Sequence, residues 1–556
     1  MIATGRDVGR GAQLARAWQL GIDADRGIDS RVGRVDRHVL RAGKIVVDEV
    51  ATKIEIGVVQ RLHQLRPDDL GAFVRTPGLS DPAWMARIRA RLADTVLAQG
   101  RYRPFYYSLG DETGIADLAA NWDFDFSPVA LTAFRAWLER HYGSLMALNA
   151  QWETAFAAWE DVRPLTTTQA MARVGENFSP WADFKIFMDI CFADAVRAGT
   201  ASVHAADPAA LAGLEGMQVP GWGGYDYARL AHAVDVMEIY DGGNNVEIVR
   251  SLNPEAIVLS TAFGVDAGTL HGIWHALLLG ERGLILWDEG GQVVGTDGTV
   301  GPWGRAYAPL FRELTGQLGT LVVNSTPHFD PVAILYSPAS FRTQWMLDHR
   351  GEGDAWSRRT AEMEGADNAV RTAMRRDAAA MISRGIQPRW VTADAIAGGG
   401  LRGMRALVLP QAIALSDAEM AAIRAFMAAG GAVLADGKAG WFDEHSRRRE
   451  GALETHAVDA AGLVAALGIS PVVSVMDTDG SPAEGLDIRV FAHGDDLLVG
   501  VQSARAEAVA RVLRVVLAQP GWVRDVRGSG GGERTQSVAI TLDPVTPTLL
   551  TIGPSP

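Results

Sequence analysis

The spacing of apolar residues changes several times along the chain, and each change marks the expected start of a new helix or strand. The segment from Ser80 to Val96 repeats apolar residues at helical intervals, and its opening Ser-Asp-Pro is typical of a helix start. The next segment, residues 104–112, is short, apolar and aromatic. It predicts a strand that ends in the sequence Gly-Asp-Glu at 110–112.

Helical and strand patterns then alternate as far as residue 287. Helices are expected over 127–138, 145–152, 181–204 and 269–279, and strands over 211–218, 234–240, 256–261 and 283–287. Strands that alternate with helices are typical of parallel βαβ units. The span from about residue 40 to 325 has the size of one (β/α)8 barrel of the TIM type, which takes about 250 residues, and an open doubly wound sheet is the alternative.

After residue 325 the pattern restarts as a second α/β segment. Strands are expected over 332–337, 387–392, 406–410 and 432–435, and helices over 367–384 and from Ser416, where a capping-box spacing occurs. The tail alternates apolar and polar residues over 486–492, 497–501 and 538–542, which predicts a small antiparallel β domain. The chain is therefore expected to divide into a barrel at 1–325, an α/β domain at 326–470 and a β domain at 471–556.

Composition and charge exclude several classes of protein. The chain has 556 residues, enough for roughly two to four domains, and its 48% apolar and 21% charged residues indicate a folded globular protein. Its net charge of −14 argues against binding to nucleic acid, which requires clustered Lys and Arg. Cys191 is the single cysteine, so no disulfide can form within the chain. No apolar run suits a membrane span or a signal peptide, so a cytoplasmic location is expected.

Glu112 stands where a catalytic carboxylate is expected in a barrel enzyme. The carboxyl ends of barrel strands face the active-site mouth, and cleavage of a glycosidic bond needs one acid and a second carboxylate. An apolar wall, for which Phe105, Tyr106 and Tyr107 are candidates, would raise the pKa of that acid. A helix-capping or salt-bridged acid pair at 111–112 is the plainer interpretation of the same residues.

The residues that follow Glu112 resemble a known family. They place aromatic, Gly and Asn residues at fixed spacings: Phe134, Trp137, Leu138, Tyr142, Gly143, Leu148, Asn149, Trp152, Thr154 and Phe156. This string resembles glycoside hydrolase family 42, the β-galactosidases, in which it closely follows the acid/base Glu. Residues 234–241 and 280–287 resemble the sixth and eighth strands of that family's barrel, and 332–442 resembles its trimerisation domain.

The resemblance implies a (β/α)8 barrel that hydrolyses β-galactosides or a related carbohydrate with retention of configuration. Glu112 would be the general acid/base, and no cofactor is implied. The second domain would have a flavodoxin-like or glutamine-amidotransferase-like fold and would join three copies of the chain. It cannot carry the Cys nucleophile of true amidotransferases, because Cys191 lies in the barrel. The expected partners are a carbohydrate substrate and further copies of the chain, without nucleic acid or membrane.

Three features depart from the family's pattern. The family carries its nucleophile Glu at the end of the seventh strand, whereas the corresponding segment here, 257–264, contains no acid. Asp111 replaces the Asn that normally precedes the acid/base and binds the sugar beside the reacting carbon. Residues 1–50 show no strand pattern and only one expected helix, near 11–20, so the barrel is expected to be incomplete at its N-terminal end or to begin differently from its relatives.

Another carboxylate must take the place of the missing Glu. Alternation along the expected strand 234–240 places Glu238 and Tyr240 on one face, so Glu238 points into the barrel if Tyr240 does. Asp241 lies just beyond, where the loop begins. Glu238 is therefore the first candidate for the nucleophile and Asp241 the second. The other acids near strand ends are Glu215, Glu247, Asp288 and Glu289.

The remaining candidates would bind the sugar rather than react with it. Aromatic faces stack on the apolar faces of sugars, and Trp222, in a Gly-rich loop, is the best stacking candidate. The expected substrate-binding residues are Tyr107, Asp111, Glu215, Trp222, Tyr240 and Trp287. His271 and His275 have a spacing that suits a metal, but no Glu completes the zinc-protease pattern, so no metal is expected.

Two other functions are compatible with the same residues. The absence of an acid from 257–264 is compatible with an inverting or otherwise atypical glycosidase of other sugar specificity. An inverting enzyme would hold its carboxyl groups about 6.5 to 9.5 Å apart, against about 5 Å in a retaining one. A barrel without its nucleophile is also compatible with a carbohydrate-binding protein that has no activity.

Overall fold

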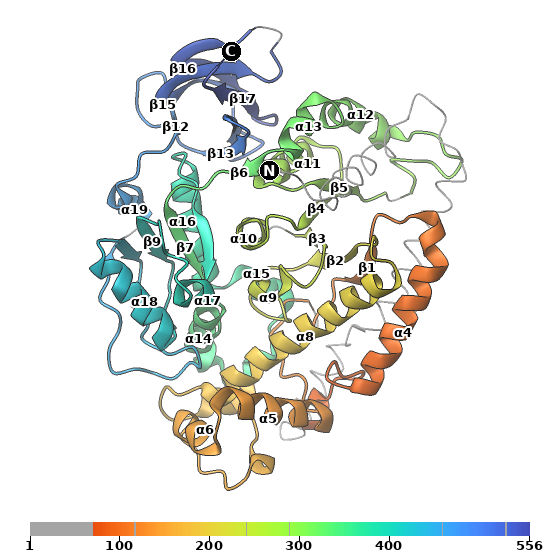
Figure 1. Cartoon of the computed structure of the whole chain (residues 1–556), viewed down its shortest axis with the longest axis vertical. Coiled ribbons are helices and arrows are strands. Elements are labelled where there is room, and N and C mark those ends of the chain that lie inside the picture. Colours follow the sequence, from red (N-terminus) through yellow and green to blue (C-terminus); the bar gives the residue numbers. More distant parts are fainter. Residues whose placement is uncertain are drawn as a thin grey trace.

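The computed structural model describes residues 70–555 except 116, 117, 241, 289, 459, 529 and 530, and arranges them as three β-sheets with their helices (Figure 1). The expected helix near 11–20 lies outside the described residues. In Figure 1 the first sheet lies at the centre and right, the second at the left and the third at the top.

The first sheet has five parallel strands whose order in space, β1-β2-β3-β4-β5, is their order along the chain. Their bounds are Tyr107–Asp111, Ala212–Met217, Val236–Ile239, Ile257–Ala262 and Gly283–Leu286. A strand order without reversal is that of a (β/α)-barrel, since a doubly wound sheet reverses at a switch point. The fold is therefore a TIM-type barrel, as predicted, and the described residues supply five of its strands.

Helices connect these strands and extend the barrel half of the chain. Their bounds are α4 Pro82–Gln99, α5 Pro128–Tyr142, α6 Leu145–Trp152, α7 Thr167–Ala172, α8 Ser179–Ala206, α9 Tyr227–Leu230, α10 Asn245–Leu252, α11 Ala267–Leu279, α12 Pro302–Leu314 and α13 Gln317–Val323. The predicted caps are present, because Asp81 accepts a hydrogen bond from the N–H of Ala83 and Ser127 from that of Ala130. None of the described helices is long and apolar enough to cross a membrane.

Packing against α4 and α8 decides which side chains of β1 face the barrel interior. A Cβ on Gly199 of α8 would lie 3.1 Å from Leu109, and the hydroxyl of Tyr107 donates a 3.3 Å hydrogen bond to the carbonyl of Val96 in α4. Tyr107 and Leu109 therefore face the helices, and by alternation Tyr106 faces the interior. Inside, one apolar cluster is formed by Phe105, Tyr106, Leu211, Val236, Ile257, Leu259 and Ile285.

The second sheet is also parallel, with the strand order β11-β10-β9-β7-β8. Its strands are β7 Val332–Tyr336, β8 Arg389–Thr392, β9 Ala406–Leu409, β10 Ala432–Ala435 and β11 His456–Ala457. Its helices are α14 Pro338–His349, α15 Ala361–Ala366, α16 Ala369–Ile382, α17 Ala393–Ala397, α18 Asp417–Ala428 and α19 Ala460–Leu467. The capping box at Ser416 and Glu419 is confirmed, whereas α14 was not predicted although Ser337-Pro338 opens it as Ser127-Pro128 opens α5.

The third sheet is antiparallel, with the order β12-β15-β17-β14-β13-β6, and β16 pairs with β15. Its strands are β6 Thr326–Pro327, β12 Val473–Met476, β13 Leu486–His493, β14 Asp496–Ser503, β15 Arg511–Asp525, β16 Glu533–Leu542 and β17 Thr548–Gly553. β6 precedes the second sheet in the sequence yet pairs with β13. The chain thus touches its C-terminal sheet as it leaves the barrel, before it forms the second sheet.

Aromatic side chains join the barrel to the second sheet. The ring of Trp222 lies 5.9 Å from that of Trp181 in α8, and 5.2 and 5.3 Å from those of Phe341 and Trp345 in α14, measured between centroids. Only 4% of Trp222 is exposed. Burial of such large aromatic surfaces stabilises the contact between the two parts, which belong to one hydrophobic core.

Candidate active site

Glu112 directly follows β1 in a backbone conformation that residues other than glycine rarely adopt. Its φ is 51°, in the left-handed region, and its N–H donates a 2.9 Å hydrogen bond to the carbonyl of Glu215 on β2. Such a conformation costs roughly 1–3 kcal/mol and persists where the surroundings impose it, often at functional sites. The hydrogen bond fixes the half-buried Glu112 beside β2, at the carboxyl ends of the barrel strands.

Gly216 of β2 brings Glu112 and Glu238 together. A Cβ on Gly216 would lie 2.5 Å from Cγ of Glu112, so the glutamate side chain lies directly against this glycine. The N–H of Gly216 donates a hydrogen bond to Oε2 of Glu238. Because its φ is 61° and no space remains for a side chain, this position requires glycine. The side chains of two glutamates, one just after β1 and one in β3, therefore lie against the same glycine.

Glu238 is the most buried acid of the group, with 2% of its surface exposed. Its Oε1 accepts a 2.7 Å hydrogen bond from the hydroxyl of Thr261 on β4. Burial raises the pKa of Glu238, and the negative charges of Glu215 and Asp111 raise it further, while the hydrogen bonds from Gly216 and Thr261 act in the opposite direction. The carboxylate is thus costly to ionise but has two donors in place for its ionised form.

Tyr106, rather than the predicted Tyr107, reaches the interior of the barrel. Its hydroxyl donates a 2.6 Å hydrogen bond to Oε1 of Glu215, and burial together with the charge of Glu215 raises its pKa, so it remains a donor. Tyr107 contacts Val96 on the outer face. The expectation that Tyr107 binds substrate is therefore corrected, because adjacent residues of a strand point to opposite faces.

Tyr240 lies at the exposed side of this group of acids and contacts Glu112. Its hydroxyl donates to Oε1 of Glu112 at 3.4 Å, and 36% of its surface is exposed. Burial, followed by the charges of Glu238, Glu112 and Asp111, raises the pKa of Tyr240. The predicted alternation is confirmed, since Glu238 and Tyr240 both turn toward the acids. Asp241, the second candidate for the nucleophile, lies outside the described residues.

Two exposed aromatic side chains stand at the ends of β4 and β5. Phe263 is 57% exposed and Trp287 is 49% exposed, and their ring centroids are 6.0 Å apart. This pair offers an apolar surface of the kind that sugars stack on. Trp222, the predicted stacking residue, is instead buried among Trp181 and α14, so that prediction is corrected.

The remaining acids serve local structure or lie apart from the group. Asp288 accepts hydrogen bonds of 2.9 and 3.1 Å from the N–H groups of Val293 and Val294 in its own loop. Glu247 pairs with Arg489 at 2.8 Å. Glu289 lies outside the described residues. The acids and tyrosines that the structure brings together are Asp111, Glu112, Glu215, Glu238, Tyr106 and Tyr240.

A parallel barrel with acids gathered at the carboxyl ends of its strands is the framework of many glycoside hydrolases. Residues 114–245 match the family model Glyco_hydro_42, described as Beta-galactosidase. This segment contains the aromatic string, α8, β2 and β3, and it begins two residues after Glu112. Over this segment the chain is similar to glycoside hydrolase family 42, whose model is that of a β-galactosidase. A comparison with curated proteins gave no match.

Solved structures share the fold at low sequence identity. An apo exo-carrageenase GH42 from Bacteroides ovatus aligns with a TM-score of 0.61 and 14% identity, over 85% of this chain and 70% of that one. Gan42B, a GH42 β-galactosidase from G. stearothermophilus, aligns in a mutant form with a TM-score of 0.62 and 14% identity, over 88% of this chain and 86% of that one. A β-galactosidase from Bacillus circulans sp. alkalophilus aligns with a TM-score of 0.61 and 13% identity, over 89% of this chain and 87% of that one. These likenesses extend the shared fold over most of the chain.

Proposed function

We propose that the protein is a retaining β-glycosidase in which Glu112 is the general acid/base and Glu238 the nucleophile. The observation that carries the proposal is that the side chains of both glutamates lie against Gly216, Glu112 through its Cγ and Glu238 through its carboxylate. A retaining glycosidase needs two carboxyl groups about 5 to 5.5 Å apart on opposite sides of the scissile bond, and two acids that share one contact residue suit this requirement.

Each residue would have one role in each half of the reaction. Glu112 gives its proton to the leaving oxygen while the carboxylate of Glu238 attacks the anomeric carbon, so that the bond to the leaving group breaks and a glycosyl ester forms. Glu112, now ionised, then takes a proton from water. The water oxygen attacks the anomeric carbon and Glu238 departs as a carboxylate. Donors from Gly216 and Thr261 stabilise that carboxylate at the beginning and end of the cycle.

The sugar would lie between the acids and the exposed aromatic pair. Asp111, Glu215 and Tyr240 offer acceptors and a donor for its hydroxyl groups, and Trp287 with Phe263 offers a stacking surface. The solved structures of this fold include β-galactosidases and an exo-carrageenase. A β-galactoside is therefore the first substrate to test.

The other expectations carry over as proposals. The barrel at 1–325, the second domain at 326–470 and the C-terminal domain at 471–556 are expected to act together, with the second domain joining three copies of the chain. A homotrimer would be seen by light scattering on the purified chain, and a monomer would contradict it. The cytoplasmic location stays a prediction.

The test is hydrolysis of a panel of nitrophenyl glycosides by the full chain and by its Glu112→Gln variant. Release from one β-glycoside by the wild type, with a loss of about 100- to 10,000-fold for poor leaving groups in the variant, is expected if Glu112 is the acid. Proton NMR of the first product would show the β-anomer. Equal activity in the variant would refute the assignment of Glu112.

The end of β4 favours a second candidate function. Thr261, Ala262 and Phe263 stand there, with no acid among them. If the first product were the α-anomer, the protein would be an inverting glycosidase with Glu238 as the base. If the wild type bound sugars but released nothing from any activated glycoside, it would be a carbohydrate-binding barrel.

A further inference from the structure

The loop that carries Tyr240 is tied to the helix that follows it. This loop, residues 240–244, lies between β3 and α10, and the structure describes all of it except residue 241; Asn245, the first residue of α10, is fully buried. The Nδ2 of Asn245 donates a 3.0 Å hydrogen bond to the carbonyl of Tyr240, and its Oδ1 accepts one of 3.3 Å from the N–H of Gly242. The place of the Tyr240 hydroxyl on Glu112 therefore depends on the first turn of α10.

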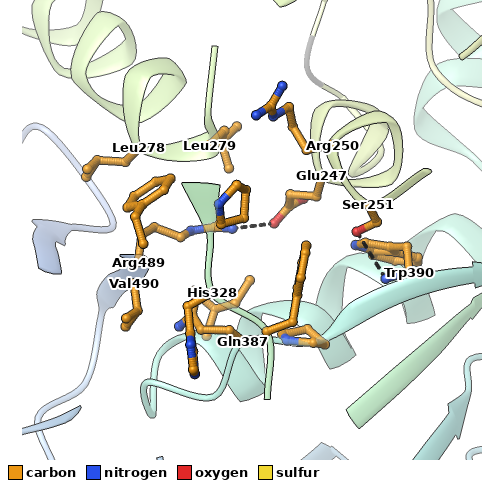
Figure 2. A pocket seen from close by; sticks show the side chains of 15 residues that line it. Glu247, Arg250, Ser251, Leu278, Leu279, His328, Gln387, Trp390, Arg489 and Val490 are labelled. Atoms are coloured by element: carbon orange, nitrogen blue, oxygen red, sulfur yellow. Dashed lines mark hydrogen bonds and ion pairs between the residues drawn. The ribbon is translucent and has the colours of Figure 1, made fainter. Parts of the chain in front are cut away.

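Glu247, in that first turn, links the loop to the C-terminal sheet. Its Oε2 accepts a 2.6 Å hydrogen bond from Asn244 in the loop, and its Oε1 accepts one of 2.8 Å from Arg489 of β13. Figure 2 shows Arg489 reaching Glu247 across a pocket lined by residues of the barrel, the second sheet and the third sheet. The carboxylate also lies at the N-terminal end of α10, where a negative charge is favoured.

Arg489 is itself held in place, so it can act as a fixed anchor. Its guanidinium makes hydrogen bonds of 2.5 and 2.9 Å to the two carboxylate oxygens of Asp487, in addition to the one to Glu247. Only 12% of the Arg489 side chain and 11% of that of Glu247 are exposed, so water screens the pair weakly. A two-point contact with Asp487 leaves Arg489 little freedom to follow the loop.

The second sheet supports the same region from another side. Arg371 of α16 donates a 3.0 Å hydrogen bond to the carbonyl of Pro220 in the loop after β2. A Cβ on Gly243 would lie 3.1 Å from Cδ of Arg371 and 2.8 Å from Pro220. Residues of all three sheets thus fix the two loops that border Tyr240.

We infer that Glu247 is a positioning residue, which with Arg489 holds the 240–244 loop so that the hydroxyl of Tyr240 stays on Glu112. The C-terminal sheet is then part of the active-site framework. This inference rests on the proposed role of Glu112 as the acid. Because Tyr240 contacts that acid, loss of the link impairs protonation of the leaving group more than attack at the anomeric carbon. A misplacement of about 1 Å can cost about 100-fold in rate.

The experiment compares three single variants of the full chain on two β-glycosides, one with an alkyl and one with a dinitrophenyl leaving group. Glu247→Ala cuts the loop from Arg489 but leaves the Arg489–Asp487 pair. We expect kcat/KM, which reports the first half of the reaction, to fall about 10- to 100-fold on the alkyl glycoside and less than about threefold on the dinitrophenyl glycoside. Glu247→Gln keeps one acceptor, for Arg489 or for Asn244, and turns the other into a donor, so its loss on the alkyl glycoside should be smaller than that of Glu247→Ala.

The matched control is Glu484→Ala, which removes an exposed partner of Arg384 at the contact between the second and third sheets. It should match the wild type on both substrates. Equal losses on both substrates in Glu247→Ala would overturn the inference, because a general loss of structure does not distinguish between leaving groups.

Amide hydrogen exchange separates this inference from the proposed function. In Glu247→Ala, exchange should quicken in peptides covering 240–252 and stay unchanged in peptides covering 107–112. Unchanged exchange over 240–252 would overturn the inference whether or not the protein is active. A wild type that hydrolyses no glycoside would instead overturn the proposed function, and the exchange result would still stand.

Discussion

Thr261 of β4 donates a 2.7 Å hydrogen bond to Glu238 of the neighbouring strand β3. In the family that the chain resembles, the nucleophile stands at the end of the strand that corresponds to β4. Here the end of β4 carries the hydroxyl group of Thr261 instead, and the adjacent strand β3 supplies the carboxylate of Glu238, which accepts a hydrogen bond from that hydroxyl. The hydrogen bond thus joins the strand that lacks the acid to the residue that we propose as its replacement.

Replacement of Thr261 by Val tests this relationship. The hydroxyl favours the ionised form of Glu238, so its loss should raise the already elevated pKa of Glu238 further. Since a nucleophile must be ionised, the acid limb of the kcat/KM profile should move to higher pH. A hydrogen bond to a charged group is worth about 1.5–3 kcal/mol, which corresponds to a shift of that limb by about one to two pH units.

The control for this change is Thr132→Val, which removes an exposed hydroxyl that bonds the Pro128 carbonyl in α5. It should leave the pH profile in place. If Thr261→Val also left the profile in place, Glu238 would not be the group whose ionisation controls the rate.

Azide rescue assigns the two acids without reference to pH. Glu238→Gln should hydrolyse no substrate, and azide added with a dinitrophenyl β-glycoside should give the α-glycosyl azide by direct attack. Glu112→Gln should still form the glycosyl ester from that substrate, and azide should give the β-product. Asp241→Asn serves as the comparison, because it was the second candidate on sequence grounds. Formation of the α-azide by Asp241→Asn rather than by Glu238→Gln would move the nucleophile to Asp241.

The elements of the fold were predictable because their signals are local. A capping residue followed by Pro located the start of α5 at Pro128, and a continuous apolar run located β10 at 432–435. The barrel followed from the order in which strands and helices alternate. Tyr107 was misassigned because the sequence predicts the strand but not which of its two faces points into the barrel. That orientation is set by packing against α4 and α8.

The arrangement of the site depends on contacts that no local pattern encodes. Gly216 looks like any glycine at a strand end until its φ of 61° and the side chain of Glu112 against it are known. Trp222 resembled a sugar platform because its loop is rich in glycine, yet those glycines let the loop pack beneath Phe341. Phe263 could have been noticed as an aromatic residue directly after a strand, by the reasoning that selected Trp287.

Removal of the exposed ring at Trp287 should weaken substrate binding rather than chemistry. An aromatic contact of this kind contributes about 0.5–1.5 kcal/mol, so Trp287→Ala should raise KM about 2- to 13-fold and leave kcat within about twofold. Phe263→Ala should act in the same direction, and the two effects should not add because the rings share one surface. Trp303→Ala, in α12 and packed against a cluster of residues from α11, α12 and α13, is a control for loss of a tryptophan in general. An unchanged KM in Trp287→Ala would place the sugar elsewhere.

A buried ion pair far from the acids joins the barrel to the segment that follows β10. Nδ1 of His445 lies 2.5 Å from Oδ1 of Asp183 in α8, whose other oxygen accepts hydrogen bonds from Tyr142 and Trp152. Burial alone would lower the pKa of His445, but the charge of Asp183 and its hydrogen bond prevail and raise it from 6.5 to about 9. The pKa of Asp183 is lowered, because the same pair outweighs the opposing effect of burial.

Stability should therefore depend on pH through His445. A histidine whose pKa is raised on folding contributes its full stabilisation at pH values below the pKa that it has in the unfolded chain. This stabilisation is lost as the pH rises through the pKa that the histidine has in the folded protein. The free energy of unfolding should fall by on the order of 3 kcal/mol between pH 6.5 and about 9. In His445→Gln this decline should be absent, and stability at pH 6 should be lower than in the wild type. His232→Gln, at an exposed position of the barrel, should keep the decline. Urea unfolding at several pH values measures the free energy of unfolding of the wild type and of both variants. A decline of equal size in His445→Gln would show that other groups cause the pH dependence.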